Sequence, residues 1–420
     1  MNQQQQAFTA YQKFVIAILV FLQFTIVLDF MIMAPLGALI MPAFKISPGQ
    51  FGLVVSVYAF SAGASGLLAA GFADRFDRKK ILVFFYTGFV LGTLLCALAT
   101  NYYFLLFARM VTGLFGGVVG SIVLAITTDL FVMRQRGQVI GLIQTAFGAS
   151  QILGIPAGLY FSNVWGWHFP FFMIVAVAAL VGIFIVLKLR PIDEHLKLQR
   201  NDNLFKHFWM TFNSSHNLIG FSATALISIG GFLLMPFTSA FTVNNLGIEL
   251  GRLPLIYLST GLFAIFCGPL IGKASDQFGK LNVFIFGAIV TIIMVLIYTN
   301  LGVTPIHIVI LVNIIFFIGI FSRIIPSQAL ISVIPDPAHR GSFMAVNSSL
   351  QQISGGVASI IAGLIVVEQA DGTLKHFNTL GYILVGTVLF SVFLVYKINQ
   401  IAARNLQLKG SEPVIDIGHG

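Results

Sequence analysis

Long apolar segments recur along this chain of 420 residues, separated by short polar breaks. A helix needs roughly 20 apolar residues to cross the hydrocarbon core of a bilayer. We expect twelve such helices, over residues 14–42, 50–73, 79–100, 102–130, 137–163, 168–189, 217–244, 250–273, 281–300, 304–334, 341–367 and 377–397. A transmembrane β-barrel would instead show segments of about ten residues with alternating hydrophobicity, and none occurs. The pattern predicts an all-α polytopic membrane protein.

The composition excludes soluble alternatives. Hydrophobic residues make up 57% of the chain and charged residues only 9%, whereas about 25% of the residues in an ordinary globular chain are charged. So few charges cannot cover the surface of a soluble fold of this size. Cys96 and Cys267 both lie in apolar segments, which is typical of buried free thiols and argues against a disulfide scaffold.

The basic residues are distributed unequally between the two sides of the predicted bundle. Of the 23 lysines and arginines, 18 lie at the termini or in breaks that follow even-numbered helices, and Lys45, Arg252 and Lys375 lie on the other side. The positive-inside rule therefore predicts that both termini are cytoplasmic. We expect the chain in the plasma (inner) membrane of a bacterium. The net charge of +9 is thus a topology signal, and we expect no nucleic-acid partner. The first apolar segment is too long for a signal-peptide core, so we expect an uncleaved helix.

The longest polar break divides the predicted helices into two groups of six. We expect a cytoplasmic N-terminus (1–13), an N-terminal bundle (14–189), a cytoplasmic central loop (190–216), a C-terminal bundle (217–397) and a cytoplasmic tail (398–420). The halves repeat each other: Asp74 and Asp276 are 202 positions apart, and Arg136-Gly137 and Arg340-Gly341 are 204 apart. Repeats of this kind, with the substrate site between them, are typical of secondary transporters. The fold predicted is two pseudo-symmetric six-helix bundles.

One loop carries a resemblance to a known family. The segment Asp74-Arg75-Phe-Asp77-Arg78-Lys79 resembles the signature between helices 2 and 3 of the major facilitator superfamily. It departs from that signature at Ala70 and Asp77, where the family usually has glycine, whereas the copy in the second half has Gly272 and Gly279.

Three further motifs are similar to the twelve-helix drug:proton antiporter branch of that family, which includes arabinose-efflux-permease-like transporters. They are Leu28-Asp29-Phe-Met-Ile-Met-Ala-Pro35 in helix 1, Arg109-x-x-x-Gly113 in helix 4, and Gly148-x5-Gly154-Ile155-Pro156-Ala-Gly158 in helix 5. The third motif departs from the usual Gly-Pro pair by the inserted Ile155. The resemblance spans all twelve predicted helices and implies alternating access between the two halves.

Asp29 is the one acidic residue expected deep in a span. It lies about 15 residues into the first helix, roughly 22 Å along the axis. An ionised aspartate at the bilayer centre costs about 2.5–3.5 kcal/mol, and desolvation favours the neutral acid. Asp29 is therefore a candidate for proton coupling. Arg109 lies at a similar depth in helix 4, where it can pair with Asp29 or bind an anionic substrate. A permanent structural pair, or an arginine bonded to backbone carbonyls, is the alternative.

Other polar residues within the spans are candidates for a substrate cavity, which the resemblance implies is lined by helices 1, 4, 5, 7, 8, 10 and 11. These residues are Gln23, Gln144, Gln151, Asn313, Arg323, Asn347, Gln351 and Gln352. Arg323 has no acidic partner in its own span, so contact with a substrate anion and hydrogen bonding between helices both remain open. For the amides the alternative is hydrogen bonding between helices, worth about 0.6 kcal/mol on average.

A second group of charged residues lies at the cytoplasmic ends of the helices. It comprises Asp74, Arg75, Arg78, Asp129, Asp276 and Arg340. The resemblance implies a latch that holds the halves together in the outward-facing state, with Asp74 near the positive end of helix 11 and braced by Arg78 and Asp129. The alternative is a solvated loop whose basic charges only set the topology.

Gly148, Gly154, Pro156 and Gly158 have a packing interpretation. Small residues let helix backbones approach closely, proline kinks a helix, and in the resembled family this region lets helices 5 and 8 slide. The sequence contains no phosphate-binding Gly-x-x-x-x-Gly-Lys-Ser/Thr loop, no His-Glu-x-x-His zinc motif and no Gly-x-Ser-x-Gly nucleophile elbow. We expect no enzyme activity, no metal and no cofactor.

These observations predict a secondary transporter, monomeric in the lipid bilayer, whose partners are a small-molecule substrate and protons. Efflux of a small organic or drug-like compound by proton antiport is the first hypothesis. A sugar or organic-acid importer or uniporter of the same fold is the alternative. A membrane receptor that has lost transport is a third, against which the retained Asp29 and the intact Asp74-Arg75-x-x-Arg78 loop argue.

Overall fold

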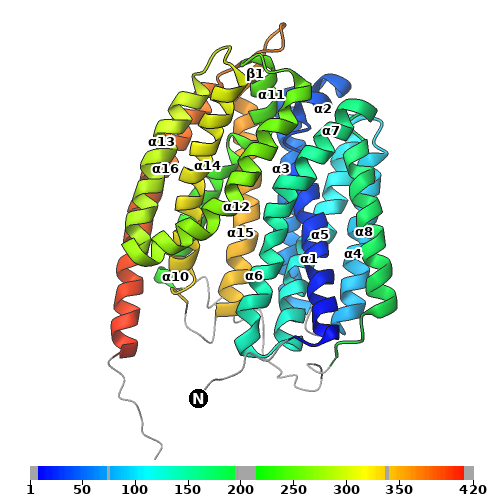
Figure 1. The fold of residues 1–420 in the computed structure, drawn as a ribbon, viewed down its shortest axis with the longest axis vertical. Helices are drawn as coiled ribbons and strands as arrows, with labels where there is room; N and C mark the ends of the chain where they lie inside the picture. The colour runs from blue at the N-terminus through cyan, green and yellow to red at the C-terminus, as the bar shows by residue number, and fades with distance from the viewer. Residues whose placement is uncertain (1–7, 73–75, 194–195, 197–213, 336–339, 411–420) are drawn as a thin grey trace, which may run out of the picture.

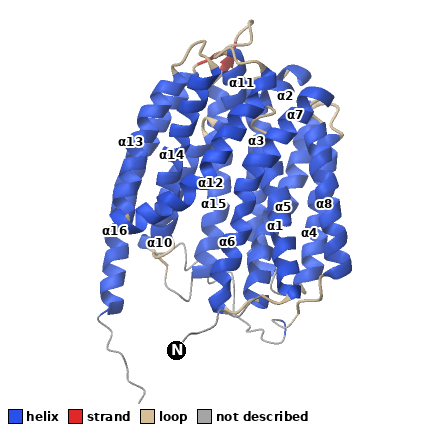
Figure 2. Ribbon diagram, viewed as in Figure 1, coloured by secondary structure: helices blue, strands red, loops and turns tan. Residues whose placement is uncertain are grey.

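The computed structural model describes residues 8–72, 76–193, 196, 214–335 and 340–410. In this part of the chain twelve helices are long and apolar enough to cross a membrane, and they run roughly parallel in one elongated body (Figures 1 and 2). The long helices are α1 (Ala10–Ile32), α3 (Pro48–Phe72), α4 (Arg78–Ala97), α5 (Tyr102–Leu130), α6 (Met133–Ala149), α7 (Ile155–Trp165), α8 (Phe169–Lys188), α10 (Ser215–Phe232), α12 (Leu253–Phe278), α13 (Lys280–Thr299), α14 (Ile306–Ile331), α15 (Arg340–Ile365) and α16 (Phe377–Gly410). A π-helical turn, Ser150–Gly154, joins α6 to α7 within one span.

Helix α1 begins, and helix α16 ends, at the same end of the molecule (Figure 1). We call this end the terminal end and the opposite end the distal end. The distal end carries the short helices α2 (Gly37–Phe44) and α11 (Thr238–Asn244), and the antiparallel pair β1 (Val367–Glu368) and β2 (Leu374–Lys375). At the terminal end α1 starts four residues before the predicted position. A capping box explains this start, because Thr9 and Gln12 exchange hydrogen bonds between side chain and backbone.

The first and seventh predicted spans are both interrupted near the distal end. Helix α1 ends at Ile32, and a turn containing Pro35 leads into α2. Helix α10 ends at Phe232, and a 3-10 turn containing Pro236 leads into α11. Proline has no backbone N–H and cannot continue the helical ladder. The two prolines are 201 positions apart, so they extend the internal repeat.

Glycines bring helices of the two halves into close contact. Where α3 packs on α15, a Cβ placed on Gly52 would lie 2.6 Å from the carbonyl oxygen of Ser359. At the same contact Ser56 donates a hydrogen bond of 2.8 Å to the carbonyl of Gly356. Helix α12 packs in turn on α7 and the π-helical turn, where Gly261 faces the backbone of Gln151. Small residues at these contacts allow backbone approach that larger side chains would prevent.

The buried side chains form different cores at the two ends. One hydrophobic cluster at the distal end contains residues of both halves; Phe51, for example, meets Phe237 with ring centroids 6.2 Å apart. Toward the terminal end, one cluster of buried residues comes only from the first half and another only from the second, and Leu67 of α3 packs against the latter. The halves are therefore joined by a shared core chiefly at the distal end.

Candidate functional site

Asp29 and Arg109 form an ion pair inside the first half. Arg109 Nη1 of α5 lies 2.8 Å from Asp29 Oδ2 of α1, and neither side chain has any exposed surface. The other carboxylate oxygen, Asp29 Oδ1, accepts a hydrogen bond of 3.2 Å from Thr93 Oγ1 of α4. Charge-assisted hydrogen bonds of this kind are stronger than neutral ones. The structure thus brings together the two residues that the sequence predicted for proton coupling.

Tyr58 of α3 completes the surroundings of this pair. The guanidinium carbon of Arg109 lies 4.3 Å from the centroid of the Tyr58 ring, a distance typical of cation–π contact. Tyr58 is almost wholly buried. Arg109 Nε and Nη2 have no hydrogen-bond partner among the described residues. Arg109 therefore has two further donor nitrogens available for a second acceptor while Nη1 holds Asp29.

Glycines position the helices that carry these side chains. A Cβ on Gly113 of α5 would lie 3.0 Å from the Cα of Tyr58, and one on Gly92 of α4 would lie 2.7 Å from Thr112 Oγ1 of α5. Gly113 is the glycine of the predicted Arg109-x-x-x-Gly113 motif. Tyr58 and Thr93 were not predicted from the sequence, because single tyrosines and threonines are common in apolar helices. Their nearness to Asp29 depends on helix packing.

The second half buries a cation without such a partner. Arg323 of α14 is 4% exposed, and its Nε and Nη2 have no hydrogen-bond partner among the described residues. Within the described chain no carboxylate lies within ion-pair distance of it. The centroid of the Phe284 ring is 6.0 Å from its guanidinium carbon. Arg323 thus differs from Arg109 in having no counter-charge among the residues that the structure describes.

Two predicted cavity amides make hydrogen bonds within the protein. Asn313 Nδ2 donates to the carbonyl of Val309 in its own helix at 2.8 Å. Asn347 Oδ1 accepts from Thr224 Oγ1 at 2.6 Å, which links α15 to α10. The remaining candidates differ in exposure: Gln23, Gln151, Gln351 and Gln352 are half-buried, and Gln144 is exposed. Contact of these residues with a substrate stays a prediction.

The predicted latch is seen only in part. Asp74, Arg75 and the side chain of Arg340 lie outside the described residues. Arg78 Nε of α4 lies 2.9 Å from Asp129 Oδ2 at the end of α5, as the bracing hypothesis requires. In the second half Asp276 lies 3.4 Å from Lys280 in an exposed pair.

Asp77, which replaces the family glycine, has a structural role in the same loop. Its Oδ1 accepts from the backbone N–H of Lys79 at 2.7 Å, so it caps α4. The same oxygen accepts from the N–H of Ile192 at 3.2 Å, and the N–H of Arg78 donates to the carbonyl of Ile192. The start of the central loop is therefore attached to the loop between α3 and α4.

The π-helical turn accounts for the inserted Ile155. The N–H of Ile155 donates to the carbonyl of Ser150, five residues earlier. A π-turn accommodates one extra residue within an α-helix, so α7 begins at Ile155, with Pro156 in its first turn, without a break in the span. Of the predicted packing glycines, Gly154 and Gly158 face Leu28 and Ile32 of α1, whereas a Cβ added to Gly148 would meet no atom within 4 Å.

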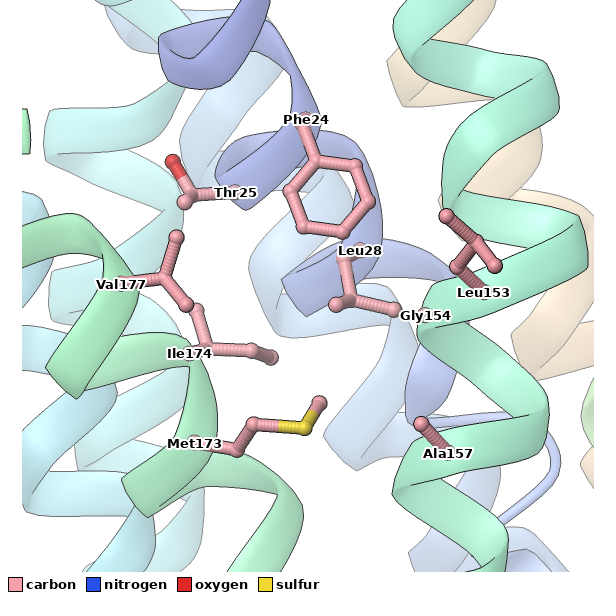
Figure 3. A pocket seen from close by; sticks show the side chains of 9 residues that line it. All are labelled: Phe24, Thr25, Leu28, Leu153, Gly154, Ala157, Met173, Ile174 and Val177. Carbon is pink, nitrogen blue, oxygen red and sulfur yellow. The ribbon is translucent and has the colours of Figure 1, made fainter.

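A small groove lies beside this turn. It has a volume of about 120 Å³ and is lined by Phe24, Thr25, Leu28, Leu153, Gly154, Ala157, Met173, Ile174 and Val177 (Figure 3). The residues come from α1, the π-turn, α7 and α8. Thr25 is the single polar residue among them, and its hydroxyl is engaged with the Leu22 carbonyl and the Tyr86 hydroxyl. The groove is suited to apolar groups.

Comparisons with known proteins agree with this architecture. The sequence pattern of the Major Facilitator Superfamily matches residues 19–359 and again residues 220–408. The uncharacterized MFS-type transporter YceJ of Bacillus subtilis (strain 168) is 24% identical over 86% of this chain and 92% of its own length. Multidrug resistance protein 3 of the same organism is 29% identical over 35% of this chain and 29% of its own. The crystal structure of a D-xylose-proton symporter superposes with a TM-score of 0.75 at 16% identity, over 91% of this chain and 97% of that one.

Proposed function

This chain belongs to the Major Facilitator Superfamily, and from that premise we propose that it exports a small organic compound in exchange for protons. Members of the family are transporters and not enzymes, and the chain is a secondary transporter of small molecules in a membrane. We also propose that it lies in the plasma membrane of a bacterium, with the terminal end in the cytoplasm. The distribution of its basic residues supports this orientation.

The buried pair of Asp29 and Arg109 carries the proposal of proton coupling. With both groups ionised the pair is neutral overall, which offsets part of the cost of burial. A proton on Asp29 removes the attraction and leaves Arg109 with a free charge. The energy of the site then depends on protonation. The efflux direction is supported by similarity to a multidrug resistance protein over about a third of this chain.

In the proposed cycle, proton and substrate bind in alternation, and the proton binds at this pair. A proton enters from the distal side and neutralises Asp29; the halves then rock about their shared contacts, and the proton leaves to the terminal side. One proton moving down about 100 mV contributes about 2.3 kcal/mol, and one unit of pH gradient adds about 1.4 kcal/mol. For an uncharged compound, the total of about 3.7 kcal/mol supports roughly a 500-fold gradient.

Transport in liposomes tests the coupling. A compound found by an efflux screen of a deletion strain would be loaded against an imposed pH gradient, with wild type, Asp29→Asn and the matched control Asp29→Glu. We expect the gradient to drive uphill transport by wild type and, more slowly, by Asp29→Glu. Asp29→Asn should retain counterflow exchange and lose uphill transport. If Asp29→Asn concentrates the compound as well as wild type, proton antiport is wrong.

The same assay decides the direction. Antiport requires that the compound move opposite to the protons. Movement with the protons would make the chain an importer of the symporter type, the function named for the xylose transporter whose fold it shares.

The latch is proposed separately. We propose that Asp74, Arg75, Arg78, Asp129, Asp276 and Arg340 hold the terminal ends together in the outward-facing state. The ion pair of Arg78 with Asp129 supports the bracing part of it. Asp74→Asn should raise the labelling of single cysteines placed in α6 near Gln144, and unchanged labelling would contradict the latch.

A further inference from the structure

The internal repeat identifies the position in the second half that corresponds to Asp29. Pro35 and Pro236, which interrupt the first and seventh spans alike, are 201 positions apart, and Asp74 and Asp276 are 202 apart. The same offset of 201 leads from Asp29 to Gly230 in α10. Where the first half has a carboxylate, the second half therefore has no side chain.

An arginine faces this position in the second half as well. A Cβ placed on Gly230 would lie 3.8 Å from Arg323 Nη2 and 3.0 Å from Thr387 Oγ1 of α16. Arg323 is not the repeat partner of Arg109, since the two are 214 positions apart. It reaches the place of the missing carboxylate from another turn of its helix. In the second half an arginine therefore lies beside the position that corresponds to Asp29, although it comes from a different position of the repeat and the acid is absent.

The charge of Arg323 needs a counter-ion from elsewhere. A guanidinium stays protonated in proteins, and an unpaired buried charge is costly. The Phe284 ring, at 6.0 Å from the guanidinium carbon, is at the limit of cation–π contact. Arg109 also has unpartnered nitrogens, but Asp29 neutralises it. Among the described residues nothing does the same for Arg323.

The residues next to these positions indicate how an anion would reach Arg323. Phe30, which follows Asp29, points toward the other half, where its ring meets Phe232 at 5.7 Å between centroids. The corresponding residue, Gly231, is exposed, and a Cβ added to it would meet no atom within 4 Å. The repeat therefore places open space beside α10 where the first half has a phenyl ring.

We propose that Arg323 binds the carboxylate group of the transported compound, beside the bare backbone of Gly230 and Gly231. The substrate class is a small organic monoanion that supplies in the second half the charge that Asp29 supplies in the first. A planar guanidinium donates two parallel hydrogen bonds to a carboxylate. This inference rests on the proposed transport function and names the substrate class for it.

Binding to the purified full-length protein tests the inference without any gradient. Benzoate, salicylate, gluconate and lactate would each be compared with the corresponding amide by the rise in melting temperature. We expect at least one carboxylate to stabilise wild type more than its amide does. Arg323→Gln should weaken the binding of that carboxylate about tenfold or more, because a charged hydrogen-bonding partner is lost.

A matched pair at Gly230 distinguishes charge from bulk. Gly230→Asp places a carboxylate beside Arg323 and should remove the preference for the carboxylate. Gly230→Asn has the same size without the charge and should retain the preference. The inference is overturned if none of the four carboxylates exceeds its amide, if Arg323→Gln keeps the preference, or if Asp and Asn at position 230 behave alike. Failure of proton coupling would appear instead with Asp29→Asn in the liposome assay, which does not depend on these results.

Discussion

The two halves of the molecule share a repeat but treat buried charge in opposite ways. In the first half Arg109 is neutralised by Asp29, held by Thr93 and covered by Tyr58. In the second half Arg323 is buried to a similar extent and faces glycine. A fold duplicated along the chain can thus keep its geometry while only one copy keeps the pair. Removal of one charged side chain should therefore have opposite effects in the two halves.

The largest effect is expected at Asp29. Asp29→Leu leaves Arg109 as an uncompensated buried cation, and removal of one partner of a buried pair costs about 3–5 kcal/mol. The free energy of unfolding in detergent, followed by circular dichroism, should fall by about that amount. The double variant Asp29→Leu with Arg109→Met should recover much of the loss. A double variant no better than the single one would show that the pair is not the cause.

Arg323→Met should act in the opposite direction. It removes a charge that costs about 2.5–3.5 kcal/mol at the centre of a bilayer and that no described acid offsets, so we expect the free energy of unfolding to rise by about 1–3 kcal/mol. The matched control is Arg252→Gln, in an exposed pair with Glu249, which should change it by less than about 0.5 kcal/mol. If Arg323→Met lowers the free energy of unfolding as Asp29→Leu does, the proposed difference between the halves is wrong.

The contact between the halves should respond less strongly. Gly52→Ala places a Cβ 2.6 Å from the Ser359 carbonyl, and overpacking of this kind costs about 1–3 kcal/mol. Gly120→Ala is the control, because nothing lies within 4 Å of its added Cβ, and alanine favours helix over glycine by about 1 kcal/mol. Melting temperatures should fall for the first variant and not for the second; equal changes would contradict close packing of α3 on α15.

The smallest effects concern the loops after α3 and α12. Arg78→Gln breaks a pair whose side chains are 6% and 21% exposed, so we expect a loss of about 1 kcal/mol. Lys280→Gln breaks a pair exposed by 36% and 77% and should cost less than about 0.5 kcal/mol, a value that salt reduces further. Urea titrations at low and high ionic strength measure both. Equal losses would mean that the two loops do not differ in burial when the protein is in solution.

Much of the fold follows from hydropathy, because each span must fill the bilayer with apolar residues. All twelve predicted spans correspond to helices in the described chain. The interruptions at Pro35 and Pro236 were not predicted, since each lies inside an apolar run that is long enough for one helix. Ile155 is visible in the sequence as a departure from a motif, but only the backbone hydrogen bond to Ser150 shows that a π-turn accommodates it.

The candidate site was predicted in part for a similar reason. A charged residue in a span is conspicuous, so Asp29, Arg109 and Arg323 could be found by eye. Tyr58 and Thr93 could not, because their residue types are common and their positions are set by contacts between helices distant in the sequence. The amides Asn313 and Asn347 were conspicuous too, yet both form hydrogen bonds within the protein.

The complete burial of Asp29 also has a kinetic consequence. A carboxylate with no exposed surface cannot exchange a proton with water until the surrounding helices separate. The rate of proton uptake by Asp29 is then limited by how often the helices open, whereas the extent of protonation still depends on the pH of the solution. Because proton exchange at Asp29 would occur only when the helices open, it would be tied to the motion of the halves. Protons would then not leak across the membrane between transport cycles.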